Sequence, residues 1–198
     1  MSYSTLLTPV FKTYEIKKST FHAALYPVAD RVAAMDVLAR EKVRFPDARH
    51  HCWAYVLGNP SSPTNQGYHD DGEPSGTAGK PMLNILHHGD FGNVVVIISR
   101  YFGGIKLGAG GLVRAYAQAT KDVLAIAEGV PYIPTTTVAL ICAFEQEGWL
   151  RNQAIKYNVV LNEFVYTDQV QCVASIPDSV LTSFVQNCQA QQIQIHQA

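Results

Sequence analysis

The chain has 198 residues, a formal net charge of −1 and 47% hydrophobic residues, which is the composition of an ordinary globular protein. This composition excludes an intrinsically disordered chain, and no apolar run approaches the ~20 residues that a transmembrane helix requires. The first twenty residues contain Glu15 and no compact apolar region. We therefore expect no secretory signal, and a soluble, cytoplasmic protein without membrane contacts.

Charges and cysteines are distributed unevenly along the chain. Residues 1–132 hold 13 Lys and Arg against 11 Asp and Glu, a net charge of +2, whereas residues 133–198 hold 2 against 5, a net charge of −3. The first part could carry a basic surface, and the second is poorly suited to attract phosphate. The four cysteines, at positions 52, 142, 172 and 188, form no CxxC pair. We therefore expect reduced, buried thiols rather than disulfides or a zinc site.

Hydrophobic patterns predict both strands and helices in residues 1–132. In chain order we expect strands at 7–18 and 20–28, a helix at 30–43, a strand at 50–57, a polar loop at 58–75, a short helix at 77–87, a strand at 93–102, a glycine-rich turn at 103–111 and a helix at 112–128. Asp30 is placed to cap the first helix. The five consecutive β-branched residues at 94–98 indicate a strand that is buried on both faces.

Residues 133–198 follow a linker marked by Pro131 and Pro134, and they have an order of their own. We expect a strand at 136–144, a helix at 145–157, strands at 159–166 and 170–176, a helix at 177–189 and a strand at 193–196. This βαββαβ order is that of a ferredoxin-like domain. The sequence therefore predicts an α+β protein with two domains, 1–132 and 133–198.

A carboxylate-rich segment at 70–81 is the first candidate for function. Asp70, Asp71 and Glu73 stand within four residues, among glycines and before Lys80. Such oxygens can hold a hard cation. Alternatively, Asp71 and Glu73 cap the start of the following helix from a solvated loop. A P-loop is excluded, because Pro81 stands where Ser or Thr must follow the lysine.

A glycine-rich segment at 99–114 joins the doubly buried strand to the long helix. The N–H groups at a helix start, with cations nearby, suit an anion. Alternatively, the glycines serve tight strand–helix packing and positive φ angles. The candidate residues for anion or nucleic-acid binding here are Arg100, Tyr101, Gly103, Gly104, Lys106, Gly110, Gly111 and Arg114.

A third segment, Arg49, His50 and His51, begins the strand at 50–57. Side chains alternate between the faces of a strand, so one histidine points inward and the other outward. A strand histidine is commonly a hydrogen-bonded structural residue, although the carboxylate-rich segment favours a functional role for this pair. Cys52 follows them, but no local signature of a cysteine enzyme surrounds it.

These segments resemble the YigZ/IMPACT family. The resemblance rests on EIKKS at 15–19, PDARHHC at 46–52, DDGEP and GTAGKP within 70–81, and RYFGG and GLVRAY within 100–116. It covers residues 12–116, and the second domain matches only in length and element order. The resemblance implies a ribosomal-protein-like β-α-β first domain, similar to domain IV of elongation factor G, and a second domain similar to domain V of that factor.

Two hypotheses for function follow. The first is a protein that binds RNA or the ribosome and is linked to translation regulation, without defined catalysis or a cofactor, using Lys80, Arg100, Lys106 and Arg114 as anion contacts. Its acidic second domain would dock a protein. The alternative is an enzyme or binding protein for a phosphorylated small molecule. In it, Asp70, Asp71 or Glu73 would hold Mg²⁺ or act as a base, beside His51 and the glycine-rich helix start.

Overall fold

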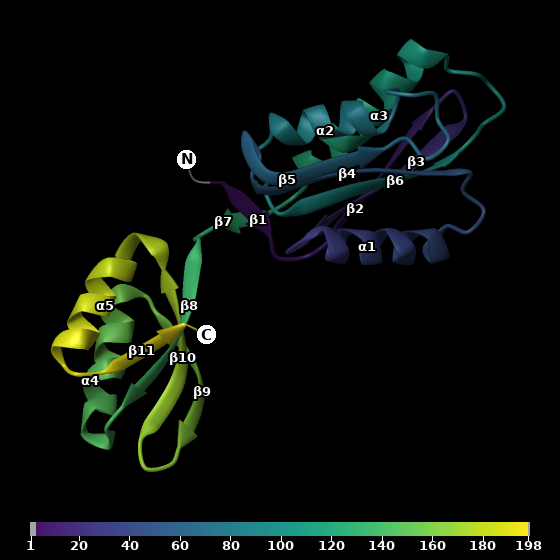
Figure 1. Ribbon diagram of the computed structural model, residues 1–198. Coiled ribbons are helices and arrows are strands. Elements are labelled where there is room, and N and C mark those ends of the chain that lie inside the picture. The colour runs from purple at the N-terminus through teal and green to yellow at the C-terminus, as the bar shows by residue number, and fades with distance from the viewer. Residues whose placement is uncertain (1–2, 198) are drawn as a thin grey trace. The chain divides into compact units, whose positions relative to one another are not determined.

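The computed structural model describes residues 3–197, and the chain divides into two compact units, Met1–Tyr132 and Ile133–Ala198 (Figure 1). Each unit has its own sheet and its own hydrophobic core. Within residues 3–197, no helix is long and apolar enough to span a membrane. The fold is therefore a mixed α/β arrangement in two parts.

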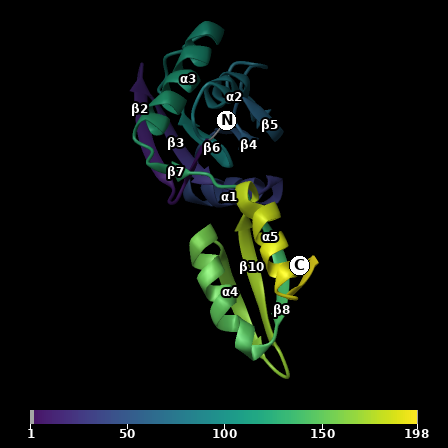
Figure 2. The same cartoon turned by 90° about the vertical axis from the view of Figure 1, so that its left-hand side faces the viewer.

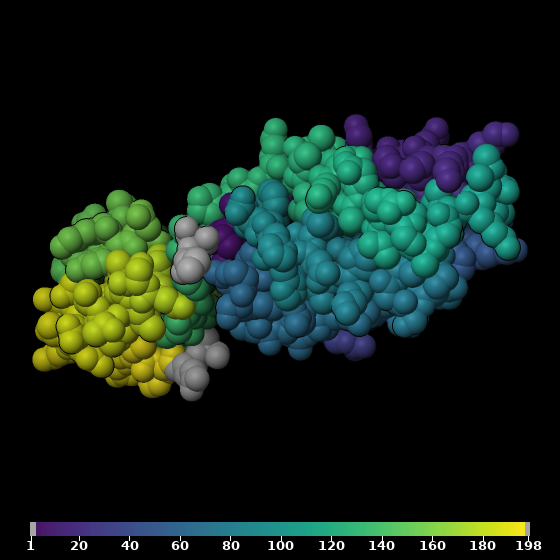
Figure 3. Space-filling view, turned by 90° about the horizontal axis from the view of Figure 1, so that it is seen from above, coloured from purple at the N-terminus to yellow at the C-terminus, as the bar shows by residue number. Residues whose placement is uncertain are grey.

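The first unit is built on a five-stranded antiparallel sheet. From edge to edge the strands are β2 (Val10–Ile16), β3 (Ser19–Pro27), β6 (Val94–Tyr101), β4 (His50–Asn59) and β5 (Ser62–His69). Helix α1 (Arg31–Arg44) covers one face, and helices α2 (Gly79–His87) and α3 (Ala109–Ala125) cover the other (Figure 1). Viewed from above, residues of α2 and α3 lie side by side over the sheet (Figure 3).

The central strand β6 supplies side chains to two cores. Val94, Val96 and Ile98 pack in the core beneath α2 and α3, whereas Val95 and Ile97 pack beneath α1, and all five are fully buried. This alternation confirms the prediction of a strand that is buried on both faces. A strand with no solvent-facing side is uniformly apolar, because neither face needs polar residues.

Helix α1 begins where the sequence predicts. The Asp30 side chain accepts a hydrogen bond from the backbone N–H of Ala33 at 2.8 Å, so it caps the helix. The strand predicted at 7–18 is shorter, Val10–Ile16, because Lys17 and Lys18 have positive φ angles and form the β2–β3 turn. All four cysteines are free and buried, as expected.

Three local predictions were wrong. The predicted polar loop contains strand β5, an exposed edge strand whose polar side chains give no apolar alternation. Helix α3 begins at Ala109 rather than Leu112, so Gly110 and Gly111 belong to its first turn. Two short strands, β1 (Ser4–Leu6) and β7 (Gly129–Pro131), pair with each other and were not predicted.

The second unit contains strand β8 (Thr135–Cys142), helix α4 (Phe144–Tyr157), strands β9 (Val160–Tyr166) and β10 (Val170–Pro177), a 3₁₀ turn at Asp178–Val180, helix α5 (Leu181–Ala190) and strand β11 (Gln194–Gln197). The sheet order is β11-β8-β10-β9, and every pairing is antiparallel. Both helices lie on one face of this sheet (Figures 1 and 2). Its hydrophobic core contains the fully buried residues Leu140, Leu150 and Phe184.

Candidate functional site

A cleft in the first unit brings together the three segments that the sequence singles out. Its volume is about 360 Å³. Its cationic walls come from Arg49, Lys106 and Arg100, and its apolar walls include Phe102 and Leu107. These residues enter from the start of β4, the end of β6 and the loop before α3, while Glu73 and Pro74 enter from the carboxylate segment. Segments distant in sequence thus share one site.

Arg100 and Glu73 form a buried ion pair at the base of this cleft. Arg100 Nη1 donates to Glu73 Oε1 at 2.6 Å, and the Tyr116 hydroxyl donates to the same oxygen at 2.8 Å. Only 6% of Arg100 is exposed. Arg100, one of the predicted anion contacts, is therefore already paired with Glu73, which compensates its charge. Removing one member of such a pair leaves an uncompensated buried charge.

The hydroxyl of Tyr116 extends this network to Cys52. Cys52 Sγ lies 3.3 Å from the Tyr116 hydroxyl and 2.9 Å from the carbonyl oxygen of Asp70. Burial raises the pKa of the Cys52 thiol and also the pKa of Tyr116. The thiol therefore stays protonated, and since the thiolate is the nucleophilic form, Cys52 is a structural residue.

The three carboxylates of the segment at 70–81 have different tasks. Asp70 accepts hydrogen bonds from the backbone N–H groups of Gly76, Ala78 and Gly79 at 2.8–3.0 Å, so it fills the N-terminus of α2. Asp71 accepts from the backbone N–H of His51 at 2.7 Å and also lies 3.9 Å from Lys42 Nζ. The expectation that Asp71 and Glu73 cap this helix was wrong, since Asp70 does so.

The Mg²⁺ alternative requires carboxylate oxygens that converge on one point. Asp70, Asp71 and Glu73 instead accept from separate protein donors. In the part of the chain that the structure describes, no three His, Cys, Asp or Glu side chains form a group that could hold a metal ion. The geometry therefore gives the carboxylates a positioning role.

The two histidines of β4 lie in different surroundings. His51 is buried, its Nδ1 lies 2.8 Å from Ser99 Oγ, and burial lowers its pKa. His50 lines the cleft, and its Nδ1 donates to the carbonyl oxygen of Asp71 at 2.8 Å, because a carbonyl oxygen only accepts. One histidine is thus structural, and the other presents an edge to the cleft.

The N-terminus of α3 opens at the cleft. Gly108, with a φ of 72°, precedes it, and among residues 3–197 no side chain caps it. The first helical hydrogen bond runs from Leu112 N to Gly108 O, so the N–H groups of Ala109, Gly110 and Gly111 precede the helical ladder. Ala109 lines the cleft. This helix end is a ready donor set for an anion.

The other predicted contacts lie in different surroundings. Arg114 is exposed, and its Nη1 would lie 3.6 Å from a Cβ added to Gly110, so its guanidinium reaches the α3 N-terminus. Lys80 instead lines a separate hollow that also includes Val113. Tyr101 packs edge-to-face against His22 and Phe45. The exposed aromatic residue in the cleft is its neighbour Phe102, which is 51% exposed.

The glycines after β6 shape the loop that carries Phe102. A Cβ at Gly103 would lie 1.9 Å from the carbonyl group of Lys18, so only glycine fits against the β2–β3 turn. The Gly103 N–H also lies 3.2 Å from Ser19 Oγ. Gly104 has a φ of 84°, which favours glycine. Gly103 and Gly104 therefore fix the geometry of this loop.

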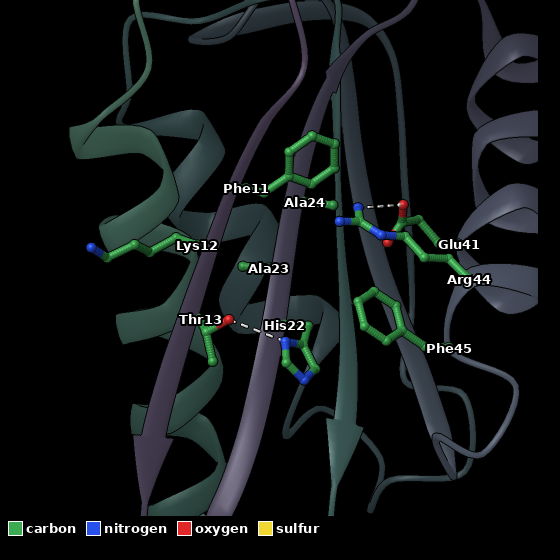
Figure 4. Close-up of a pocket in the computed structure, with 9 residues that line it drawn as sticks. All are labelled: Phe11, Lys12, Thr13, His22, Ala23, Ala24, Glu41, Arg44 and Phe45. Atoms are coloured by element: carbon green, nitrogen blue, oxygen red, sulfur yellow. Dashed lines mark hydrogen bonds and ion pairs between the residues drawn. The ribbon is translucent and has the colours of Figure 1, made fainter.

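A second, smaller hollow of about 50 Å³ lies on the α1 face (Figure 4). Glu41 there is 1% exposed, and its Oε1 accepts from the Tyr26 hydroxyl at 2.6 Å and from Arg44 Nη1 at 3.4 Å. Burial and Glu41 raise the pKa of Tyr26 to about 12. Our sequence analysis missed this glutamate, although its spacing from Ala34 and Val37 places it on the core-facing stripe of α1.

Comparisons with known proteins give the family of this chain. The Impact N-terminal domain family matches residues 17–124, more than half of the chain. An IMPACT family member of Haemophilus influenzae is 36% identical over 170 residues, which cover 86% of this chain and 82% of that protein. The IMPACT family member YigZ of Escherichia coli is 41% identical over 138 residues, covering 70% of this chain and 68% of that protein.

A crystal structure described only as that of a hypothetical protein is similar over the whole chain. Its TM-score is 0.75 at 32% identity, and the match covers 100% of this chain and 97% of that one. The family profile spans β3 to α3, which are the elements that build the cleft. The chain therefore belongs to the IMPACT family.

Proposed function

We propose that the chain binds RNA on the ribosome through the cleft, and that it acts in translation regulation without catalysing a reaction. The observation that carries this proposal is the uncapped α3 N-terminus with Arg49, Lys106 and Arg114 around it. Proteins bind RNA with cations for phosphate and with aromatic rings for bases, and Phe102 supplies an exposed ring.

The resemblance to domains IV and V of elongation factor G supports a ribosomal partner, since those domains belong to a translation factor. The second unit follows the ferredoxin-like element order, and its net charge is −3. Like charge disfavours contact with phosphate. We therefore assign RNA contact to the first unit, and we propose that the second unit docks a protein.

The electrostatic contribution to this binding is modest. The first unit has a net charge of only +2, and Glu73 neutralises Arg100 inside the cleft. If the three remaining cations each meet one phosphate of a single strand, the logarithm of the affinity falls with the logarithm of salt with a slope of about −2. Binding should therefore be weak at high salt and detectable at low salt.

Co-sedimentation with ribosomes across a salt series tests this proposal. Arg49→Ala/Lys106→Ala should weaken sedimentation and flatten its salt dependence. The control is Arg31→Ala/Lys121→Ala, which removes the same charge from exposed positions that do not line the cleft. The proposal is wrong if no binding occurs at low salt, or if both double variants lose binding equally.

A second candidate is a binding protein for a phosphorylated small molecule. The observation in its favour is the volume of about 360 Å³, which lies in the ~300–1,000 Å³ range of small-molecule sites. The catalytic form of this candidate lacks a free base among the carboxylates, since each already accepts from protein donors. Absence of ribosome binding with retained phosphate-ester binding would favour this candidate.

A further inference from the structure

We infer that the cleft receives a single unpaired nucleotide, with its phosphate at the N-terminus of α3 and its base against Phe102. The inference rests on the proposed RNA-binding function and specifies its ligand. The shared chemistry is a phosphate ester that carries a planar base, whether it belongs to a strand of RNA or to a free mononucleotide.

The phosphate end of the cleft is defined by the α3 N-terminus. Residues 109–111 carry backbone N–H groups that precede the helical ladder, and a Cβ built at Gly108 would meet no atom within 4 Å. The space before the helix is therefore open. Lys106, which lines the cleft, and Arg114, whose guanidinium reaches Gly110, add positive charge near this end. A helix start of this kind binds one phosphate group through its N–H donors.

The floor of the cleft provides independent support. Arg100 lines the cleft while it is 94% buried, and its Nε has no acceptor within residues 3–197. Its Nη1 is held by Glu73, so the guanidinium is fixed with one donor unsatisfied. A buried donor without an acceptor is rare in folded proteins. Nε has almost no accessible surface, so a ligand oxygen can meet it only where the atoms between Nε and the cleft give way.

The base end of the cleft is apolar. Phe102 is half exposed, and Leu107, Leu112 and Pro74 also line the cleft. The Arg100 guanidinium carbon lies 5.7 Å from the centre of the Phe102 ring, so cation and ring are held close together. An exposed aromatic ring beside apolar side chains is the type of surface on which an unstacked base lies.

The size of the cleft favours one nucleotide over a duplex. A volume of about 360 Å³ accommodates a ligand the size of one nucleotide, at the low end of the ~300–1,000 Å³ range. In a double helix both faces of a base are already stacked, so no base can lie against Phe102 without being unpaired. We therefore expect single-stranded segments or strand ends to bind, and paired segments to be rejected.

Fluorescence anisotropy with a labelled oligoadenylate strand tests the inference. The single strand should bind at least about ten-fold more tightly than the same strand annealed to oligouridylate, which is the effect of one stacked base. Adenosine monophosphate should compete for the strand, while adenosine and inorganic phosphate should compete at least about ten-fold less well, since each offers half of the ligand.

The variants Phe102→Ala, Phe102→Tyr and Ile105→Ala test base stacking on Phe102 without changing the charge of the cleft. Phe102→Ala should weaken single-strand binding about ten-fold, and Phe102→Tyr should keep it, because stacking needs only a ring. Ile105→Ala is the matched control, since Ile105 is exposed in the same loop but does not line the cleft. All three variants should remain folded at the assay temperature, because about half of each side chain is exposed.

The outcomes distinguish this inference from the function on which it rests. Equal binding of single strand and duplex, or no effect of Phe102→Ala, overturns the nucleotide inference even if Arg49→Ala/Lys106→Ala still weakens RNA binding. If RNA does not bind but adenosine monophosphate does, and Phe102→Ala weakens that binding, the nucleotide site stands and the ribosomal function is wrong.

Discussion

The five-stranded sheet has a buried glutamate on each of its faces, and both accept from a tyrosine and an arginine. At the cleft, Arg100 Nη1 lies 2.6 Å from Glu73, and 7% of the Arg100 side chain is exposed. On the α1 face, Arg44 Nη1 lies 3.4 Å from Glu41, and 48% of the Arg44 side chain is exposed. Identical residue types thus form a tight buried pair and a loose surface pair.

The difference shows what each face is built to do. Arg100 is held rigidly beneath an open cleft of about 360 Å³, which is the preorganisation that ligand binding requires. Arg44 lies over the Phe11 ring at 4.4 Å, beside a hollow of only about 50 Å³ (Figure 4). The α1 face therefore uses its arginine to cover aromatic surface, and the cleft face uses its arginine to hold a site.

The largest expected effect is that of Glu73→Gln. Neutralising Glu73 leaves the Arg100 charge buried and uncompensated, so the free energy of unfolding should fall by about 3–5 kcal/mol. Denaturant unfolding measures this change, with exposed Glu128→Gln as the control. Glu73→Gln/Arg100→Met should recover part of the loss, and a loss below about 1 kcal/mol for the single variant would contradict the pairing.

Acid should lower the free energy of unfolding through two histidines on the α1 face, His22 and His51. Burial lowers the pKa of His51 and of His22, and Arg44 further lowers that of His22. Because each pKa is lower when folded, the stability these groups contribute is present above the unfolded pKa of about 6.5 and is lost as pH falls through the folded value.

The pH dependence of unfolding tests this assignment. Since one proton changes the slope by at most about 1.4 kcal/mol per pH unit, His51→Gln should flatten the decline below about pH 6.5 by up to that amount. Exposed His88→Gln is the matched control and should leave the slope unchanged. An unaltered slope in His51→Gln would show that other groups carry the acid sensitivity.

A smaller effect is expected for Glu41→Gln. Arg44 is half exposed and water can hydrate it, while the amide oxygen of Gln can still accept from Tyr26. The free energy of unfolding should therefore change by about 1 kcal/mol or less. A loss as large as that of Glu73→Gln, in the same denaturant titration, would remove the contrast between the two faces.

The smallest effect is expected for Arg44→Lys, which keeps a positive charge beside Glu41. Cation–π contact at an exposed site contributes about 0.5–1 kcal/mol and lysine retains part of it, so the free energy of unfolding should fall by about 0.5 kcal/mol or less. Ribosome co-sedimentation should be unchanged, because Arg44 does not line the cleft. Arg31→Lys, at an exposed position of the same helix, serves as the matched control. Loss of ribosome binding in Arg44→Lys alone would place the interface on the α1 face.

The sequence predicted the elements that carry strong local signals. The uniform β-branched run of β6 and the Asp30 cap of α1 are confirmed. Strand β5 was missed, because an exposed polar edge strand is specified by pairing with β4 rather than by its own pattern. The start of α3 was misplaced, because glycine is a weak helix former and three glycines precede Leu112.

The site was predicted at the level of segments rather than of individual side chains. All three segments contribute to the cleft, but the partner of each charge depends on tertiary contacts that span tens of residues. Arg100 pairs with Glu73 over 27 positions, and His51 meets Asp71 over 20. Phe102 rather than Tyr101 faces the cleft, because Tyr101 packs against His22 and Phe45.

The close contact of Gly103 with the β2–β3 turn has a consequence for the order of folding. Gly103 and Ser19 are 84 positions apart, so their contact carries a large loop-closure cost and can form only after β3 and β6 have paired. The loop that bears Phe102 should therefore reach its native conformation late. We expect a substitution that weakens this contact to accelerate unfolding and to leave the refolding rate nearly unchanged, because a contact that forms after the transition state contributes only to the unfolding barrier.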